Sequence, residues 1–148
     1  MKQQVPPPFH LAIPVSDLEA TRQFYTKILG CSVGRESTTW IDFNFFGHQV
    51  TTHLASEDSA VTVTNLVDDI EVPVRHFGVI LDWDAWNILA QKLSGKNIRF
   101  LIKPHVRFRG KVGEQGTLFL LDPSLNGLEF KAFKKPGDLF ARAADTLQ

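Results

Sequence analysis

The chain has little cysteine, no excess of either charge and no long apolar run. Cys31 is the only cysteine among 148 residues, which excludes an internal disulfide framework and a cysteine-rich zinc site. The 16 Lys and Arg residues balance the 16 Asp and Glu residues, so neither nucleic acid nor a strongly charged partner is expected. The sequence has no run of about eighteen apolar residues, which a membrane span needs, and its amino terminus lacks the apolar core of a signal peptide. We therefore expect a soluble, cytoplasmic protein.

What the sequence does contain is a well-marked β-α-β-β-β pattern in its first half. A strand expected at residues 9–15 leads into a helix in which Ser16 and Glu19 form a capping box and which Gly30 ends. Alternating apolar residues predict further strands at 32–36, 40–46 and 49–54. With 43% hydrophobic residues in 148, the chain is long enough to bury one substantial core.

The second half repeats this pattern, and its opening histidine, helix cap and helix-ending glycine follow one another at nearly the same spacing as in the first half. Its opening strand carries His76 where the first carries His10, Asp82 is expected to cap the second helix, and Gly95 to end it. Strands are expected at 98–103, 117–121 and 127–133, with a basic insertion at 105–111. We predict an α+β domain at about 9–134: module one at about 9–55, a linker at about 56–74 with at most one short strand near 61–63, and module two at about 75–134. The tail, 135–148, is expected either to dock on this or a neighbouring chain or to fray.

The repeat is what draws attention to Glu129, since a lone carboxylate on a strand is usually a solvated surface group. In the predicted register His10 corresponds to His76, and His53 corresponds to Glu129. Equivalent positions in two related modules become neighbours across a pseudo-twofold axis, so these four side chains are candidates for one metal site at that axis. Imidazole and carboxylate ligands suit iron, nickel, zinc or manganese. The alternative for each histidine is a packed or surface residue.

Other residues allow two interpretations each. The alternation of Arg107, Arg109 and Lys111 predicts a cationic strand face, which would attract an anionic substrate or simply be solvated. His48 and His105 lie in expected connections and are either proton donors or ordinary loop histidines. The aromatic residues are expected to line a pocket or to pack between helix and sheet, Tyr25 being assigned to the core; they include Trp40, Phe43, Phe45 and Phe46.

Together these features resemble the vicinal oxygen chelate superfamily, which includes glyoxalases, fosfomycin and bleomycin resistance proteins and extradiol dioxygenases. The resemblance rests on VSDLEATRQFYTKILG at 15–30, RHFGVIL at 75–81 and FLLDPSLNGLEF at 119–130. Within the superfamily, WIDFNFFGHQ at 40–49 and VRFRGKVGEQGT at 106–117 resemble small proteins described as extradiol-type dioxygenases. Leu125 departs from the pattern, because the superfamily turn usually has Gly there, and this predicts a strained or altered turn.

The resemblance implies that the two modules form a curved mixed sheet around a divalent metal. His10, His76 and Glu129 would bind this metal, iron(II) first, with nickel, zinc or manganese as alternatives. The resemblance also implies a ring-cleaving extradiol-type dioxygenase that acts on a small catecholic or vicinal-oxygen substrate, since two His and one carboxylate leave adjacent metal positions open. His53 is then an acid/base residue or a fourth ligand, with His48 as a further proton donor. The alternatives are a glyoxalase-like lyase or isomerase and a metal-free small-molecule-binding protein. A homodimer is expected, with the modules paired within one chain or between chains.

Overall fold

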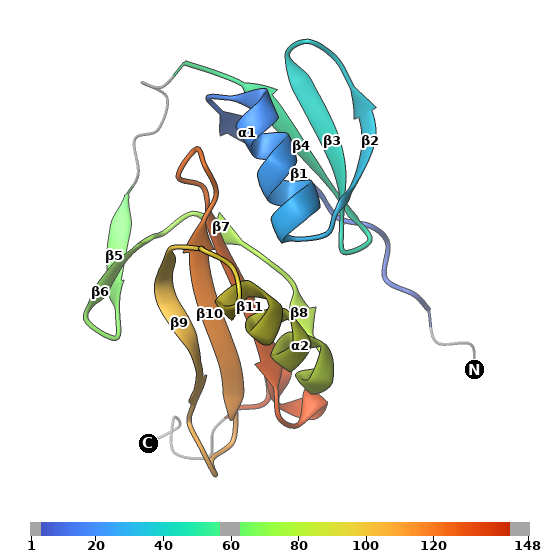
Figure 1. Ribbon diagram of the computed structural model, residues 1–148. Coiled ribbons are helices and arrows are strands. Elements are labelled where there is room, and N and C mark those ends of the chain that lie inside the picture. The colour runs from blue at the N-terminus through green and yellow to red at the C-terminus, as the bar shows by residue number, and fades with distance from the viewer. Residues whose placement is uncertain (1–3, 57–62, 143–148) are drawn as a thin grey trace. The chain divides into compact units, whose positions relative to one another are not determined.

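Figure 1 shows the computed structural model of the chain, which describes residues 4–56 and 63–142. These residues form two compact units of mixed α and β structure. Unit 1 contains 4–56 together with 122–126, and unit 2 contains 63–121 and 127–142. None of the helices formed by the described residues has the length and apolar character that a bilayer crossing requires. Each unit has its own sheet and its own helix, as the sequence repeat predicts.

Unit 1 is built on a four-stranded mixed sheet in the order β1-β4-β3-β2. Strand β1 pairs in parallel with β4, and the other neighbours are antiparallel. One face of the sheet is apolar and buried, and the opposite face is polar, because alternate side chains of a strand point to opposite sides. The strand bounds are β1 His10–Val15, β2 Ser32–Glu36, β3 Trp40–Phe45 and β4 His48–Leu54, close to those predicted.

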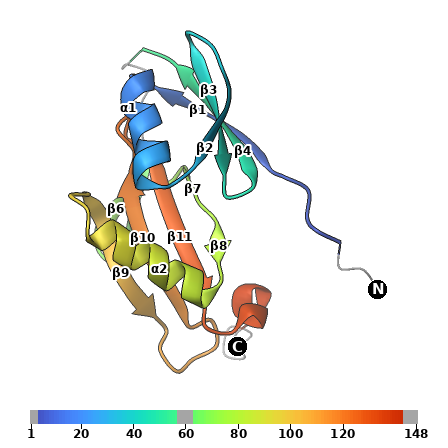
Figure 2. The same cartoon turned by 45° about the vertical axis from the view of Figure 1, so that its right-hand side comes forward.

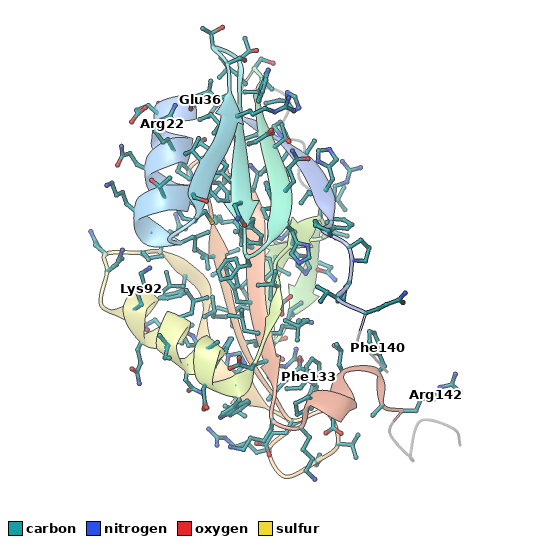
Figure 3. All side chains as sticks on the ribbon, turned by 90° about the vertical axis from the view of Figure 1, so that its right-hand side faces the viewer. Arg22, Glu36, Lys92, Phe133, Phe140 and Arg142 are labelled. Atoms are coloured by element: carbon teal, nitrogen blue, oxygen red, sulfur yellow. The ribbon has the colours of Figure 1, made fainter. Side chains whose placement is uncertain are left out.

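A helix covers the apolar face of this sheet (Figure 1). It consists of α1, Leu18–Gln23, continued by a π-helical turn, Phe24–Ile28. Tyr25 is fully buried and stacks on Phe43 with ring centroids 5.0 Å apart, so the expected core role of Tyr25 is confirmed. In Figure 3, Arg22 of α1 and Glu36 of β2 are labelled where they meet in an ion pair. Such an exposed pair contributes little free energy, so the aromatic packing is the main attachment of the helix.

The predicted capping box at the start of α1 is wrong. The N-cap is Asp17, whose Oδ1 accepts a 2.9 Å hydrogen bond from the Ala20 N–H. Ser16 lies one residue before the cap, and its own N–H donates to Ser124 Oγ at 2.9 Å. Both residue types cap helices well, so the sequence alone did not decide between two adjacent candidates.

Unit 2 contains a five-stranded sheet with the path β7-β11-β10-β9, in which β8 also pairs with β11. The strands are β7 His76–Phe77, β8 Ile80–Leu81, β9 Phe100–Arg107, β10 Gln115–Leu121 and β11 Gly127–Phe133. Strand β9 therefore extends into the basic stretch that was expected to be an insertion. The opening strand is split at Gly78, where the backbone passes very close to β11: a Cβ built on Gly78 would lie 1.6 Å from the Glu129 carbonyl oxygen.

The helix of unit 2 is α2, Trp83–Ser94, with Asp82 as N-cap and Gly95 as C-cap, both as predicted. Figure 2 shows it crossing one face of the sheet. Trp86 anchors it, because its indole N–H donates a 2.9 Å hydrogen bond to the Phe130 carbonyl of β11. The buried face of the helix consists of Trp86, Leu89, Ala90 and Leu93.

The linker expected between the modules contains a β-hairpin that sequence analysis missed. Strands β5, Thr64–Val67, and β6, Ile70–Pro73, are joined by Asp68 and Asp69, both at positive φ (48° and 63°). This two-residue turn suits the twist of a hairpin, although Asn-Gly is the usual signal for it and Asp-Asp is a weak one. The hairpin packs on the sheet through a small cluster of Val72, Ile102 and Phe119. The strand expected near 61–63 falls largely outside the described residues.

The tail begins with a short 3-10 helix, Pro136–Phe140. It is tied to unit 2 by the Asp138 carboxylate, which accepts from the Gly113 N–H at 3.0 Å. Phe140, labelled in Figure 3, is 90% exposed, so its ring does not dock on the described part of this chain. Residues 143–148, where the rest of the predicted tail lies, are outside the described residues.

Candidate functional site

His76 and Glu129 come together in unit 2, as expected for two ligands of one metal. His76 lies at the start of β7, which pairs in parallel with the beginning of β11, the strand that carries Glu129. His76 Nε2 is 3.1 Å from Glu129 Oε2, and the two side chains are 32% and 16% exposed. They are shielded enough for a strong interaction and open enough for a ligand to enter.

The contact made by Nδ1, the other ring nitrogen of His76, decides which nitrogen carries the hydrogen. His76 Nδ1 lies 2.9 Å from the Pro73 carbonyl oxygen. A carbonyl oxygen only accepts, so Nδ1 carries the hydrogen and, in the neutral ring, Nε2 carries a lone pair. That lone pair faces a carboxylate oxygen, which is also an acceptor. A cation between the two atoms, either a proton on Nε2 or a metal ion, would turn this unfavourable contact into a favourable one.

Glu129 is held in place by neighbours on the same face of the sheet. Thr117 Oγ1 donates to Glu129 Oε1 at 2.8 Å, and Lys131 Nζ lies 3.8 Å from the same oxygen. Phe119 packs against the His76 ring with centroids 5.0 Å apart. Oε1 is thus occupied by donors while Oε2 is directed to His76, and the pair is preorganised.

The His76–Glu129 pair fits a divalent metal on geometric grounds. Nitrogen and oxygen ligands lie about 2.1 Å from a divalent transition-metal ion, so two of them at the right angles of an octahedral site are about 3.0 Å apart. The observed separation of 3.1 Å agrees with that value. A histidine that binds a metal through one ring nitrogen usually donates the N–H of the other to a carbonyl or carboxylate. His76 makes such a contact, from Nδ1 to the Pro73 carbonyl.

His10, the third expected ligand, lies in unit 1 at the start of β1, on the polar face of its sheet. Its Nδ1 is 2.8 Å from Gln49 Oε1. Gln49 Nε2 in turn donates to Asp42 Oδ2 at 3.3 Å, and Thr51 Oγ1 donates to Asp42 Oδ1 at 2.6 Å. Sequence analysis missed Asp42, Gln49 and Thr51, although their alternation on β3 and β4 places them on the face that carries His10.

An open hollow of about 330 Å³ lies on this face of unit 1. Asp42, Asn44, His48 and Gln49 contribute to its lining, with Gly34 and Arg35 from β2. Asp42 is 7% exposed despite its charge, and Arg35 Nε reaches to 3.9 Å from Oδ2. The Arg35 side chain is 84% exposed, so Asp42 depends mainly on Thr51 and Gln49 for its partners.

The predicted equivalence of His53 and Glu129 is wrong by two residues. In unit 1, His10 pairs with Gln49; in unit 2, His76 pairs with Gly127. Counting two residues along each closing strand makes Thr51, not His53, the counterpart of Glu129. The error arose because spacing along the chain does not fix the register of a strand pair, which depends on hydrogen bonding between distant segments and not on helix caps and turns.

The other two histidines proposed from the sequence for unit 1, His53 and His48, lie at different positions on or next to its sheet. His53 is exposed on β4, on the same face as Gln49 and Thr51, and its backbone pairs with Pro14 and Trp40. His48 Nδ1 accepts from the Phe9 N–H at 2.9 Å, a structural contact within unit 1.

On the unit 2 sheet, the basic side chains of β9 contact the hairpin. His105 Nδ1 contacts the Lys103 carbonyl at 3.0 Å, and its Nε2 lies 3.8 Å from Asp68. Arg107 also pairs with Asp68, at 3.4 Å, so part of the predicted cationic face is neutralised by the tip of the β5–β6 hairpin.

Of the expected aromatic pocket, Phe43 and Phe45 are core residues, whereas Trp40 lies on the polar face under the Arg35 guanidinium. Among residues 4–56 and 63–142, no three His, Cys, Asp or Glu side chains gather into a group that could hold a metal ion. The structure thus brings together two of the expected ligands, His76 and Glu129, and describes His10 within its own unit.

Two buried groups in unit 1 have shifted pKa values. Burial raises the pKa of Tyr25 well above its ordinary value, and the nearby charge of Asp122 raises it further. Burial also raises the pKa of Asp122, although hydrogen bonds from Asn126, Tyr25 and Ser124 oppose the shift. These two residues hold the turn 122–126 and are structural.

Comparison with known proteins gives a family and several structural neighbours. The sequence model of the Glyoxalase/Bleomycin resistance protein/Dioxygenase superfamily matches residues 8–130. A glyoxalase/bleomycin resistance protein/dioxygenase from Alicyclobacillus acidocaldarius is 32% identical, with 90% of this chain and 96% of that chain covered and a TM-score of 0.76. No curated protein matches the sequence.

Two more distant structures share the fold at 14% identity. A fosfomycin resistance protein from Listeria monocytogenes has a TM-score of 0.66, with 92% of this chain and all of that chain covered. A lactoylglutathione lyase from Agrobacterium tumefaciens has a TM-score of 0.62, with 95% and 100% covered.

Proposed function

Because the chain belongs to the Glyoxalase/Bleomycin resistance protein/Dioxygenase superfamily, we propose that it is an enzyme whose divalent metal is held by His10, His76 and Glu129. Iron(II) is the first candidate, followed by nickel, zinc and manganese. The observation that carries the proposal is the His76–Glu129 pair, in which a ring nitrogen and a carboxylate oxygen, two atoms of the kind that bind such ions, lie 3.1 Å apart. A divalent ion held by both atoms would satisfy the two acceptors that face each other when the His76 ring is neutral.

The substrate we propose has two adjacent oxygens, as a catechol has, and the reaction is extradiol-type ring cleavage. Two imidazoles and one carboxylate leave adjacent positions on the ion, which when bound supplies chelation of both substrate oxygens and activation of dioxygen. The counterpart of Glu129 in unit 1 is Thr51, so that position has no second carboxylate of the kind a glyoxalase-like isomerase uses. Asp42 is close by, but both its oxygens accept hydrogen bonds, from Thr51 and Gln49.

Several side chains have roles in this proposal besides metal binding. His53 is exposed on the face of unit 1 that carries Gln49, and acts as the acid/base residue that moves a substrate proton. His48 is the second candidate, and its contact with the Phe9 N–H leaves Nε2 as the nitrogen that donates. Lys131, 3.8 Å from Glu129, stabilises a deprotonated substrate oxygen.

The first experiment is metal analysis of protein isolated without oxygen. We expect one divalent ion per chain in the native protein, and a large loss in His10→Gln, His76→Gln and Glu129→Gln, which keep the side chains polar. His105→Gln is the matched control, since His105 also contacts a backbone carbonyl through Nδ1, but its Nε2 faces Asp68 and not Glu129. Unchanged metal content in all three variants would reject the assignment.

The second experiment separates the possible reactions. Oxygen uptake with a panel of catechols is expected from the iron-loaded protein and not from Glu129→Gln. Metal binding without oxygen uptake, but with turnover of a hemithioacetal, would replace the dioxygenase by a lyase or isomerase. Tight binding of small aromatic compounds by a metal-free native protein would instead indicate a sequestering protein.

We further propose that the enzyme is a homodimer, and a mixing experiment tests which chain supplies His10. If ligands come from two chains, mixed dimers of His10→Gln and Glu129→Gln contain one site with all native ligands, and metal binding is partly restored. If each site lies within one chain, mixing restores nothing. Light scattering of the native protein checks the dimer itself.

A further inference from the structure

We propose that Asp42 is a positioning residue: acting through the side-chain amide of Gln49, it fixes His10 in the tautomer whose Nε2 is free to bind a metal ion. The role in metal binding rests on the function proposed above, but the choice of tautomer does not. The proposal is carried by two hydrogen bonds within unit 1 that join Asp42 to His10 through Gln49, and by a third from Thr51 that holds Asp42.

This series of hydrogen bonds starts at the Asp42 carboxylate, a group that can only accept hydrogen bonds. The Asp42 carboxylate is 7% exposed, and Thr51 Oγ1 donates to its Oδ1 at 2.6 Å. This short bond fixes the carboxylate plane and leaves Oδ2 directed at Gln49. The hollow on this face leaves the network accessible from solvent without removing the shielding of Asp42 itself.

The next link is an amide, which has a donor end and an acceptor end. Because Asp42 Oδ2 is an acceptor, Gln49 presents Nε2 to it, at 3.3 Å. The acceptor end, Oε1, is then necessarily turned toward His10. Rotating the amide by half a turn would place Oε1 against a carboxylate oxygen and leave two acceptors in contact, so Asp42 selects the amide orientation.

The last link converts the amide orientation into a tautomer. Gln49 Oε1 lies 2.8 Å from His10 Nδ1, so Nδ1 must carry the hydrogen. In the neutral ring Nε2 is then a lone-pair donor suited to a metal ion. His76 reaches the same tautomer by a simpler route, since the Pro73 carbonyl accepts directly from its Nδ1.

This comparison explains why unit 1 needs the extra residues. In unit 2 the acceptor is part of the backbone and cannot rotate. In unit 1 it is a side-chain amide, which would present either end to His10 if nothing held it. Asp42 supplies the missing constraint, and Thr51 supports Asp42 from the position equivalent to Glu129.

The test exchanges donors and acceptors without changing shape. In Asp42→Asn, the new amide N–H₂ is expected to face Gln49, whose amide turns and presents its own N–H₂ to His10. Nδ1 then becomes the acceptor, and the hydrogen moves to Nε2. The measurement is the ring ¹⁵N shifts of His10 in metal-free, full-length protein, at least two pH units above the ordinary imidazole pKa of about 6.5. His10→Gln assigns the signals.

A second substitution is designed to restore the original tautomer. In the double variant Asp42→Asn, Gln49→Glu, the new carboxylate accepts from both the Asn at 42 and His10 Nδ1. We expect the Nδ1–H form in the native protein, the Nε2–H form in Asp42→Asn and the Nδ1–H form again in the double variant. Thr52→Val is the control, because its hydroxyl donates to the Ile41 carbonyl and is not part of this network.

Metal titration gives an independent readout. Affinity is expected to fall about 10- to 100-fold in Asp42→Asn, as for other groups that orient a ligand, and to recover in the double variant. The same His10 tautomer in native protein and Asp42→Asn would overturn the proposal. If the tautomer changes as expected but metal affinity does not, His10 is not a ligand. This outcome would contradict the proposed function but not the role of Asp42 in fixing the His10 tautomer.

Discussion

The Tyr25 hydroxyl donates a 3.0 Å hydrogen bond to Asp122 Oδ2, although the two residues are 97 positions apart in the chain. Tyr25 belongs to the helix of unit 1, and Asp122 begins the turn that joins β10 to β11. The same carboxylate accepts from the Ser124 and Asn126 backbone N–H groups. One buried acidic residue therefore organises the turn and ties it to the helix.

This contact predicts a loss of stability at alkaline pH. Burial, with the Asp122 charge second, raises the pKa of Tyr25 in the folded state well above its unfolded value of about 10. The contribution is fully present below pH 10 and is lost as pH rises above it, since the unfolded chain releases the proton and the folded one does not. The free energy of unfolding should fall by up to about 1.4 kcal/mol per pH unit from this group.

The control for the alkaline effect is Tyr25→Phe. We expect it to lower stability by about 1 kcal/mol at neutral pH and to remove the Tyr25 part of the alkaline slope. Urea unfolding at several pH values measures both. Because Tyr25 is the only tyrosine, tyrosinate absorbance also reports its ionisation directly, and a midpoint near pH 10 in the native protein would contradict the prediction.

Gly78→Ala should disrupt unit 2 near the candidate site. The added methyl group would lie 1.6 Å from the Glu129 carbonyl oxygen, so β7 and β11 must separate. We expect a loss of about 3 kcal/mol of unfolding free energy, measured by thermal or urea unfolding. Gly34→Ala is the matched control on a strand of unit 1, where the nearest atoms are 3.6 Å away, and its stability should change little.

Leu125→Gly should stabilise the protein. Leu125 has a φ of 66°, as the missing glycine of the superfamily turn predicted, and its side chain gains little from packing because the residue is 59% exposed. Glycine removes the left-handed strain at a small entropic cost, for a net gain of about 0.5–1 kcal/mol. Leu125→Ala keeps the strain, so equal gains in the two variants would refute this explanation.

Thr117→Val should weaken metal binding without unfolding the protein. It removes the hydroxyl that donates to Glu129 Oε1 at 2.8 Å while nearly keeping the side-chain shape. Glu129 then has more rotational freedom, and affinity for a divalent ion should fall about 10-fold. Thr117→Ser retains the hydroxyl and should bind as the native protein does; titration calorimetry compares the three.

Most of the fold was predictable because its signals are local. Alternating apolar residues predicted strands β1 to β4 and β9 to β11 to within a few residues, and Asp82 and Gly95 marked the ends of α2. The β5–β6 hairpin was missed because its turn is Asp-Asp, and Ser16 was preferred to Asp17 because adjacent capping residues look alike. In the candidate site, the repeat pointed to His76 correctly as the counterpart of His10, but it pointed to Glu129 through a register that was wrong by two residues. Asp42 and Gln49 carry no motif and gain importance only from their neighbours.

The sequence by itself determined the order of strands and helices in each half of the chain, with a histidine at each opening strand, because periodicity and capping are properties of short segments. Only the tertiary structure decided which residues of the closing strands oppose those histidines. It placed Gln49 beside His10, and it made Thr51 the residue of unit 1 that is equivalent to Glu129 of unit 2. It also gave His76 its two partners, the Pro73 carbonyl and the Glu129 carboxylate. Strand register is set by pairing between distant segments, and a shift of two residues keeps every side chain on the same face while changing all of its partners.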